Sequence, residues 1–499
     1  MAVITLRNSQ KPKILSWVLI YWRILLFITL TNKRRRDKMA TIIQKGTLVT
    51  ASETLRADLK IDNGKISMIS DQIKEENEDI IIDATNKYVF PGLIDPHTHL
   101  GIEGTLDDFE SGTKAAASGG VTTVINFTDP NNSQTFLEDL AEWREKAKSS
   151  IIDYGFHSII NKCNSAVLEE IYKLPDEGVT SIKLFMAYKE NMVNDEELYL
   201  LMKAAKQAGV VTNIHAENGR VIDQLIDEAL NNNNTDPINH ACTRPPGLEA
   251  EAVARALRIA EVTEAPTYIV HISSEEAMEE FIRAKERGVQ AFGETCPQYL
   301  VLNENYLKKD AKEAVKYICS PPLRTLKDQK ILWNNINSEM ISTIGSDHAS
   351  HPYLNGKENG IDNFTKAPNG LPGIESTLLL LYHYGVYEGR ITLPKLVEIT
   401  SRNPASIFGL HPRKGCLKVG SDGDVVIFDP SKSTVISKET QKQGTEYNIY
   451  EGMELQGSID YVLSRGEIIV KENEVVGTSG RGKYLFRNKF NEFSDEGGQ

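Results

Sequence analysis

Short apolar runs alternate with segments of helical periodicity between residues 88 and 345. The segments 196–208, 248–262 and 274–287 repeat apolar positions every three or four residues, as amphipathic helices do. Strands that alternate with helices over about 300 residues predict an α/β fold, the (β/α)8 TIM barrel. The expected strands are Tyr88–Ile94, Thr122–Phe127, Tyr154–Ile159, Ser181–Phe185, Val210–Ile214, Thr267–His271, Val289–Phe292 and Ile341–Gly345.

Both ends of the chain carry the pattern of short β-strands. Asp62-Asn63-Gly64 separates two runs of alternating polarity within residues 59–69, which is typical of a β-hairpin. A similar pattern returns after residue 415, so the two end segments most simply form one small β-sandwich beside the barrel. We therefore expect an N-terminal extension over 1–38, the β-sandwich over 39–88 and 411–487, the barrel over 89–410 and a flexible tail over 488–499.

The composition is typical of a soluble globular protein, with 40% hydrophobic and 25% charged residues. A formal net charge of −13 argues against a nucleic-acid-binding surface. The five cysteines are scattered and none belongs to a C-x-x-C pair. We therefore expect no disulfide framework and a reducing, cytoplasmic location.

Residues 1–38 differ from the rest because they carry nine basic side chains and one acidic one. Within them, Ile14–Leu30 is mainly apolar but is interrupted by Arg23, and a cluster of basic residues follows it. The run is shorter than the roughly 20 residues of a membrane span, and a secretory signal would carry its charge before the run. We expect the folded protein to start near Met39 and to be free of membrane, with a membrane anchor as the less favoured alternative.

Potential metal ligands stand where the expected barrel strands end, and active sites of such barrels lie at that end. His97 and His99 are two residues apart, so on a strand both imidazoles point to one face and can reach one metal ion. By itself such a pair is more often two surface histidines, and each further residue has an ordinary explanation of its own. Their gathering at the ends of different strands nevertheless favours metal ligation. These further residues are Lys183, His215, His271 and Asp347.

Lys183 lies within an apolar strand, where an ammonium group is costly to bury. One interpretation is a lysine that extends to the solvent at the strand edge. The other is that burial lowers the pKa of the lysine, so that the neutral amine takes up CO2 and the carbamate bridges two metal ions.

These residues lie in motifs that resemble those of the dihydropyrimidinase and hydantoinase family of cyclic amidohydrolases. The resemblance covers residues 41–487 and rests on many segments. The motifs are Pro91-Gly-Leu-Ile-Asp-Pro-His-Thr-His, Asp108-Phe-Glu-Ser-Gly-Thr-Lys-Ala-Ala-Ala, Lys183-Leu-Phe-Met-Ala-Tyr-Lys, His215-Ala-Glu-Asn-Gly, His240 to Pro246, His271-Ile-Ser-Ser, Gly293-Glu-Thr-Cys-Pro-Gln-Tyr-Leu, Cys319-Ser-Pro-Pro-Leu-Arg, Gly345-Ser-Asp-His, Pro368-Asn-Gly-Leu-Pro-Gly-Ile-Glu and Asn403-Pro-Ala.

The resemblance implies a centre of two metal ions, usually zinc, although another divalent metal would fit the same ligands. His97, His99 and Asp347 would hold the more buried ion, and His215 and His271 the second. Lys183, as N6-carboxylysine formed with CO2, would bridge both ions together with a hydroxide.

The resemblance also implies the reaction. The hydroxide would attack the amide carbon of a dihydropyrimidine or hydantoin ring and yield an N-carbamoyl amino acid. Asp347 would accept the proton and pass it to the leaving nitrogen, and Tyr188 would donate a hydrogen bond to the developing oxyanion. The backbone at Ser320 and Asn369 would hold the edge of the ring. Family members generally form homotetramers, so we expect one here.

Several alternatives stay open or are set aside at this point. Dihydroorotases usually carry an arginine two residues after the His-x-His pair, where Gly101 stands here. The segment after His99 looks shorter than in typical hydantoinases, which leaves an allantoinase-type ureide hydrolase open. Non-enzymatic assembly proteins of the same fold have lost metal ligands, whereas this chain retains all six.

Overall fold

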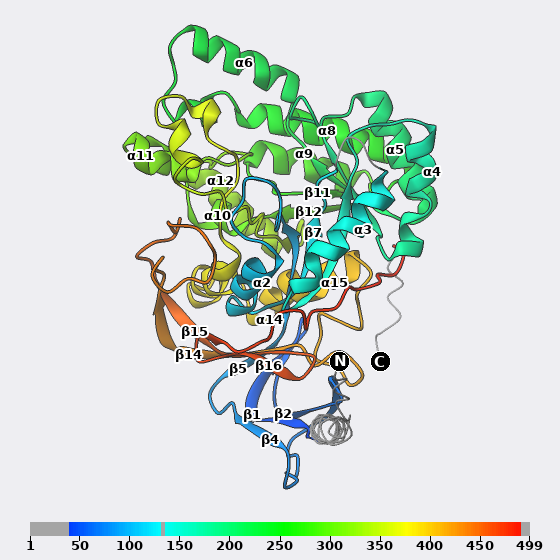
Figure 1. The fold of residues 1–499 in the computed structure, drawn as a ribbon, viewed down its shortest axis with the longest axis vertical. Coiled ribbons are helices and arrows are strands. Elements are labelled where there is room, and N and C mark those ends of the chain that lie inside the picture. Colours follow the sequence, from blue (N-terminus) through cyan, green and yellow to red (C-terminus); the bar gives the residue numbers. More distant parts are fainter. Residues whose placement is uncertain (1–38, 131–134, 491–499) are drawn as a thin grey trace, which may run out of the picture.

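The computed structural model describes residues 39–130 and 135–490, and within this part eight parallel strands form a nearly closed barrel (Figure 1). Each strand pairs with its neighbour in sequence, in the order β13-β12-β11-β10-β9-β8-β7-β6. The predicted (β/α)8 barrel is therefore confirmed. The strands are β6 (Leu93–Thr98), β7 (Val121–Phe127), β8 (Asp153–Ile159), β9 (Ser181–Phe185), β10 (Val211–His215), β11 (Thr267–Ile269), β12 (Ala291–Thr295) and β13 (Ile341–Ile344).

The first and last barrel strands meet through a few backbone contacts. Thr98 and His348 form an isolated parallel bridge, and the backbone N–H of Asp347 donates to the carbonyl of His97 at 2.9 Å. The N–H of His99 likewise donates to the carbonyl of His348 at 3.0 Å. The closure of the barrel thus places two segments with predicted metal ligands side by side.

Two of the expected strands are displaced. The run Tyr88–Ile94 is divided between β5 (Tyr88–Pro91), which belongs to another sheet, and β6. Gly92 lies between them, where a Cβ atom would approach Thr122 Oγ1 to 2.1 Å. The run at Val289 begins later, as β12, because the N–H of Val289 still bonds the carbonyl of Ala284 at the end of the preceding helix.

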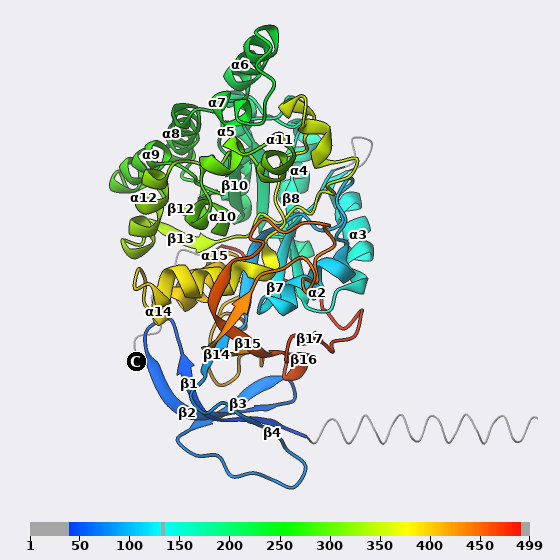
Figure 2. The ribbon, with the colours of Figure 1, turned by 90° about the vertical axis from the view of Figure 1, so that its left-hand side faces the viewer.

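Helices surround the barrel on its outer side (Figures 1 and 2). The three helices that the sequence pattern indicated are present as α5 (Asp195–Ala208), α8 (Pro246–Thr263) and α9 (Glu275–Glu286). The others are α2 (Phe109–Ser118), α3 (Phe136–Lys146), α4 (Ser165–Ile171), α6 (Gly219–Asn231), α7 (Asn239–Cys242), α10 (Pro297–Val301), α11 (Ala311–Ala314), α12 (Leu326–Asn337), α13 (Thr377–Leu380), α14 (Leu393–Val397) and α15 (Asn403–Ile407).

A second, mixed sheet of nine strands lies at one end of the molecule (Figure 2). The N-terminal and C-terminal strands join through β5, which pairs with one strand from each group. Asn63 and Gly64 have φ values of 51° and 78°, as the predicted hairpin turn requires. The strands are β1 (Thr41–Val49), β2 (Thr54–Asp62), β3 (Lys65–Ser70), β4 (Ile80–Asp83), β5, β14 (Val425–Val435), β15 (Glu454–Ser464), β16 (Glu467–Lys471) and β17 (Glu474–Val475).

The described part of the chain begins at Met39 and ends at Phe490. The expected extension over residues 1–38 lies outside the described residues. Asn488 and Phe490 donate backbone hydrogen bonds to Gly409 and Gly209, so the C-terminal tail follows the barrel as far as residue 490. Among the described residues, no helix is long and apolar enough to cross a membrane.

A buried cationic side chain joins the barrel to the mixed sheet. Lys414 is 2% exposed, and its ammonium lies 2.6 Å from carboxylate oxygens of Asp153 and Asp424 and 3.2 Å from one of Asp422. Asp153 begins β8, whereas the two other acids lie just before β14. The three carboxylates could hold a metal ion, but the lysine already supplies the positive charge there.

We expect Lys414→Met to lower the free energy of unfolding by about 3–5 kcal/mol, because it leaves the buried carboxylate of Asp424 without its cation. Asp153 keeps Arg465 as a partner, and Asp422 keeps Lys65 and Arg413. Chemical denaturation would measure the change. The matched control is Lys432→Met, since that lysine pairs with Asp460 at 2.7 Å but is 52% exposed, and we expect a change below about 1 kcal/mol there. Equal effects of the two substitutions would contradict this account of the joint.

Candidate active site at the carboxyl ends of the barrel strands

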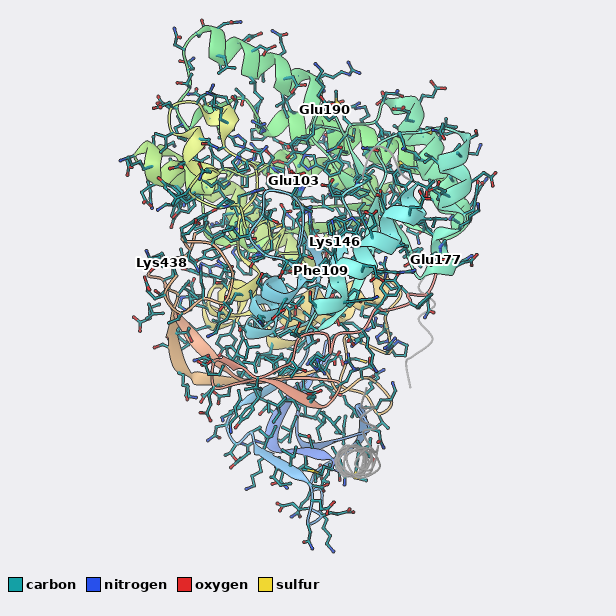
Figure 3. All side chains as sticks on the ribbon, in the orientation of Figure 1. Glu103, Phe109, Lys146, Glu177, Glu190 and Lys438 are labelled. Carbon is teal, nitrogen blue, oxygen red and sulfur yellow. The ribbon has the colours of Figure 1, made fainter. Side chains whose placement is uncertain are left out.

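A cavity of about 140 Å³ lies at the carboxyl ends of the barrel strands. Glu103 and Glu190, in loops that follow β6 and β9, lie on the same side of the barrel, away from the mixed sheet (Figure 3). All nine residues that we singled out from the sequence line this cavity. They are His97, His99, Lys183, Tyr188, His215, His271, Ser320, Asp347 and Asn369.

Three of these side chains form a first cluster. The Nε2 atoms of His97 and His99 lie 3.0 Å and 3.1 Å from Oδ1 of Asp347. Burial opposes the charging of His97, yet the nearby carboxylates of Glu294 and Asp347 raise its pKa to about 9. Burial by itself would raise the pKa of Asp347, but the imidazoles of His97 and His99 hold it well below its usual range. Two nitrogen atoms and a carboxylate oxygen thus converge on one point, as a divalent metal ion requires.

His215 and His271 form a second cluster on neighbouring parts of the barrel. Nδ1 of His215 lies 2.8 Å from Nε2 of His271, so the two ring nitrogens face each other. The other ring nitrogen of His215, Nε2, lies 2.9 Å from Oε2 of Glu217. The pair can therefore present two nitrogen atoms to one cation.

Lys183 lines the same cavity and is 1% exposed. Its Nζ lies 4.8 Å and 5.1 Å from the ring centroids of Phe127 and Phe185. Within the part of the chain that the structure describes, the ammonium has neither a hydrogen-bond acceptor nor an ion-pair partner. Burial lowers the pKa of Lys183 to about 8, against the opposing attraction of Asp347 and Glu294. A buried lysine in this state is suited to reaction as a neutral amine.

Three residues of the site have a backbone conformation that side chains rarely adopt. Their φ values are 65° for Tyr188, 41° for His271 and 52° for Asp347. Such positions cost about 1–3 kcal/mol each and persist where the surrounding structure imposes them, which is common at functional sites. Backbone strain therefore occurs at three of the residues that the sequence motifs indicated as functional.

Two carboxylates that the sequence reasoning missed orient the histidines. Oε1 of Glu294 lies 2.6 Å from Nδ1 of His97 and also accepts the backbone N–H of His271 at 3.0 Å. Glu217 contacts the His215 ring in the same way, through Oε2 at 2.9 Å from Nε2. Metal-binding histidines usually direct their second ring nitrogen to a carboxylate in this way. The signal in the sequence was an acid within two of the family-like motifs, His215-Ala-Glu-Asn-Gly and Gly293-Glu-Thr-Cys-Pro-Gln-Tyr-Leu.

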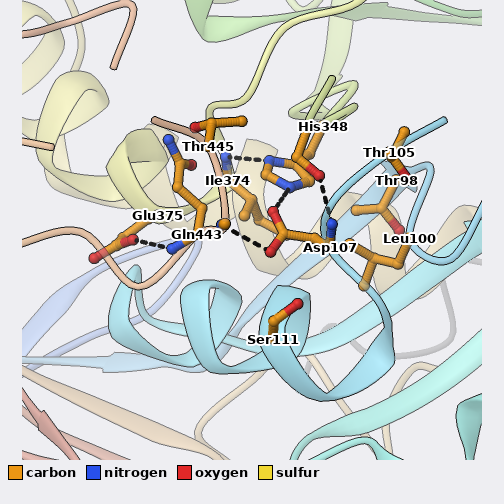
Figure 4. Close-up of polar contacts among 12 residues, drawn as sticks. Thr98, Leu100, Thr105, Asp107, Ser111, His348, Ile374, Glu375, Gln443 and Thr445 are labelled. Atoms are coloured by element: carbon orange, nitrogen blue, oxygen red, sulfur yellow. Dashed lines mark hydrogen bonds and ion pairs between the residues drawn. The ribbon is translucent and has the colours of Figure 1, made fainter. Parts of the chain in front are cut away.

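The loop of residues 99–108, here called the β6 loop, borders the cavity through Ile102. Asp107 fixes the end of this loop, because its carboxylate lies 3.0 Å from Nε2 of His348 and accepts the N–H of Gly444 at 2.9 Å (Figure 4). The N–H of Gly373 points to the other ring nitrogen of His348 at 3.1 Å. Asp107 thus connects His348, the neighbour of Asp347, with the C-terminal segment at Gly444.

Tyr188 completes the set of residues that line the cavity. Its ring centroid lies 5.0 Å from that of His215. Burial raises the pKa of the tyrosine, so the hydroxyl keeps its proton and can act as a hydrogen-bond donor.

Comparisons with known proteins agree with this arrangement. The amidohydrolase family model matches residues 88–469. A D-hydantoinase of Geobacillus stearothermophilus is 46% identical, with 91% of this chain and 97% of the relative covered, and one of Ralstonia pickettii is 42% identical, with 91% and 100% covered.

Solved structures show the same likeness. A crystal structure of a D-hydantoinase has a TM-score of 0.89 at 47% identity, and a dihydropyrimidinase from Brevibacillus agri has a TM-score of 0.89 at 43% identity. In both cases 91% of this chain and 100% of the other chain are covered. The chain therefore belongs to the amidohydrolase family, within its branch of hydantoinases and dihydropyrimidinases.

Proposed function

We propose that this protein hydrolyses the ring amide of a 5,6-dihydropyrimidine or a 5-substituted hydantoin and releases an N-carbamoyl amino acid. The observation that carries the proposal is the convergence of two histidine clusters and a buried lysine on one cavity. Among the described residues this lysine has no hydrogen-bond or ion-pair partner. The relatives named above support the class of substrate. We further propose a homotetramer, as the resemblance implies, and a cytoplasmic location, as the scattered cysteines indicate.

The residues present fit a pair of divalent metal ions. In this proposal His97, His99 and Asp347 would hold one ion and His215 and His271 the other, and Lys183, as N6-carboxylysine, would supply further oxygen ligands. Nitrogen and carboxylate oxygen are donors that zinc accepts, and the ring nitrogens already converge in pairs. Bound metal ions would supply a nucleophilic hydroxide at neutral pH and would polarise the ring carbonyl.

The side chains around the cavity have separate tasks in the reaction. Asp347 accepts a proton from the attacking water and delivers it to the ring nitrogen that leaves. The Tyr188 hydroxyl donates a hydrogen bond to the carbonyl oxygen as it gains negative charge. Backbone groups of Ser320 and Asn369 hold the edge of the ring, so that the scissile bond faces the ligand clusters.

Ring opening by the purified full-length chain, supplied with zinc and bicarbonate, tests the proposal. We expect turnover of dihydrouracil or a 5-substituted hydantoin and at least a 100-fold lower rate for Lys183→Ala, as is usual when a group central to catalysis is lost. Turnover of allantoin alone would instead indicate an allantoinase. Absence of both turnover and bound metal would contradict the enzymatic proposal and favour a non-enzymatic assembly protein.

Tyr188→Phe is expected to lower kcat by about 10²–10³-fold, because it removes one hydrogen bond to the developing oxyanion. Steady-state kinetics would measure this while metal analysis shows unchanged zinc. Tyr172→Phe is the control, since this side chain is 41% exposed on the outside of the barrel. A Tyr188→Phe enzyme with the kcat of the parent would exclude the tyrosine from this role.

Glu294→Gln is expected to weaken metal binding by about 10–100-fold, because the carboxylate no longer orients the His97 ring. Competition with a chelator would measure the affinity. Glu279→Gln, on the exposed side of α9, is the control. If the Glu294→Gln protein bound zinc as tightly as its parent, the orienting role of this carboxylate would be wrong.

A further inference from the structure

A third buried lysine, in addition to Lys183 and Lys414, lies beside the cavity without lining it. Lys357 is 0% exposed, and its ammonium donates to the carbonyls of Ile318, Pro368 and Gly370 at 2.6, 2.8 and 2.7 Å. The three N–H groups of a lysine are thereby all used. Unlike Lys414, this lysine has no carboxylate partner within the described part of the chain.

The three carbonyls belong to the two segments that carry Ser320 and Asn369, both of which line the cavity. Pro368 and Gly370 stand on either side of Asn369, and Ile318 stands two residues before Ser320. The Pro368 carbonyl and the Asn369 N–H belong to the same peptide group, so the ammonium fixes the plane of that group. One cation therefore sets the relative position of both segments.

Other contacts make this arrangement depend on the lysine. The N–H of Gly370 donates to the Ile318 carbonyl at 3.2 Å, which ties the two segments directly. Gly370 has a φ of 132°, and a Cβ atom there would lie 2.7 Å from that of Ala349. The segments are thus packed closely in a conformation of their own, and loss of the ammonium would leave three buried carbonyls with fewer donors.

We propose that Lys357 is a positioning residue that holds the ring-binding backbone of Ser320 and Asn369 in register, and thereby sets the affinity for substrate. The inference rests on the proposed function, because it assumes that these backbone groups bind the ring. Lys357 contacts none of the predicted metal ligands through the hydrogen bonds of its ammonium. Its loss should therefore affect substrate binding without removing metal.

The test is the steady-state kinetics of Lys357→Met, which keeps the length of the side chain and removes the charge. We expect KM to rise by about tenfold or more, with kcat within about threefold of the parent, since uniform binding is lost. Zinc content should be unchanged. Lys285→Met is the matched control, because its ammonium also donates to a backbone carbonyl, that of Ala291 at 3.1 Å on β12, and it should leave KM unchanged.

Lys357→Arg keeps the test decisive if the methionine variant does not fold. A planar guanidinium retains the cation but cannot direct three N–H groups from one atom, so KM should exceed that of the parent, and an unchanged KM in this variant would also overturn the inference. An unchanged KM in the folded methionine variant, or a lowered kcat with unchanged KM in either variant, would overturn the inference while the proposed function stands. A parent chain that opens no ring would instead overturn the proposed function itself.

Discussion

The barrel encloses the ammonium of Lys183 in an interior that offers it no hydrogen-bond acceptor within the described chain. Two other buried lysines show how unusual this is, since Lys414 meets three carboxylates and Lys357 meets three carbonyls. A charged group without partners is costly to bury. Carbamylation would replace the ammonium by an anionic ligand, and metal ions held by the histidine clusters beside it would balance that charge.

The rest of the structure serves to hold this point in place. Parallel strands bring ligands that are far apart in the sequence to one end of the barrel. Strained backbone at His271 and Asp347 turns their side chains inward, while Glu294 and Glu217 fix the orientation of the imidazole rings. The mixed sheet helps to hold the β6 loop. The segment between its strands β14 and β15 contains Gly444, whose N–H donates to Asp107.

Sequence patterns predicted the architecture and most of the site, because local periodicity and short motifs carry that information. They could not predict which carboxylate orients His97, since Glu294 lies 197 residues further along the chain. The expected strand ended at Phe292, before this acid, whereas β12 includes Glu294. The role of Lys357 could not be predicted either, because its three partners are backbone carbonyls. Every residue has such a carbonyl, so the sequence does not indicate which ones a lysine contacts. The break at Gly92 was missed because the side chain that crowds this position, Thr122, is distant in the sequence.

Anomalous diffraction at the zinc edge, from crystals grown with zinc and bicarbonate, tests the central claim most directly. The account predicts two peaks about 3.5–4 Å apart, as in two-metal hydrolytic sites. One should lie beside His97, His99 and Asp347, the other beside His215 and His271, with density extending from Nζ of Lys183 to both. A single peak, or an unmodified Lys183 between two metals, would contradict it.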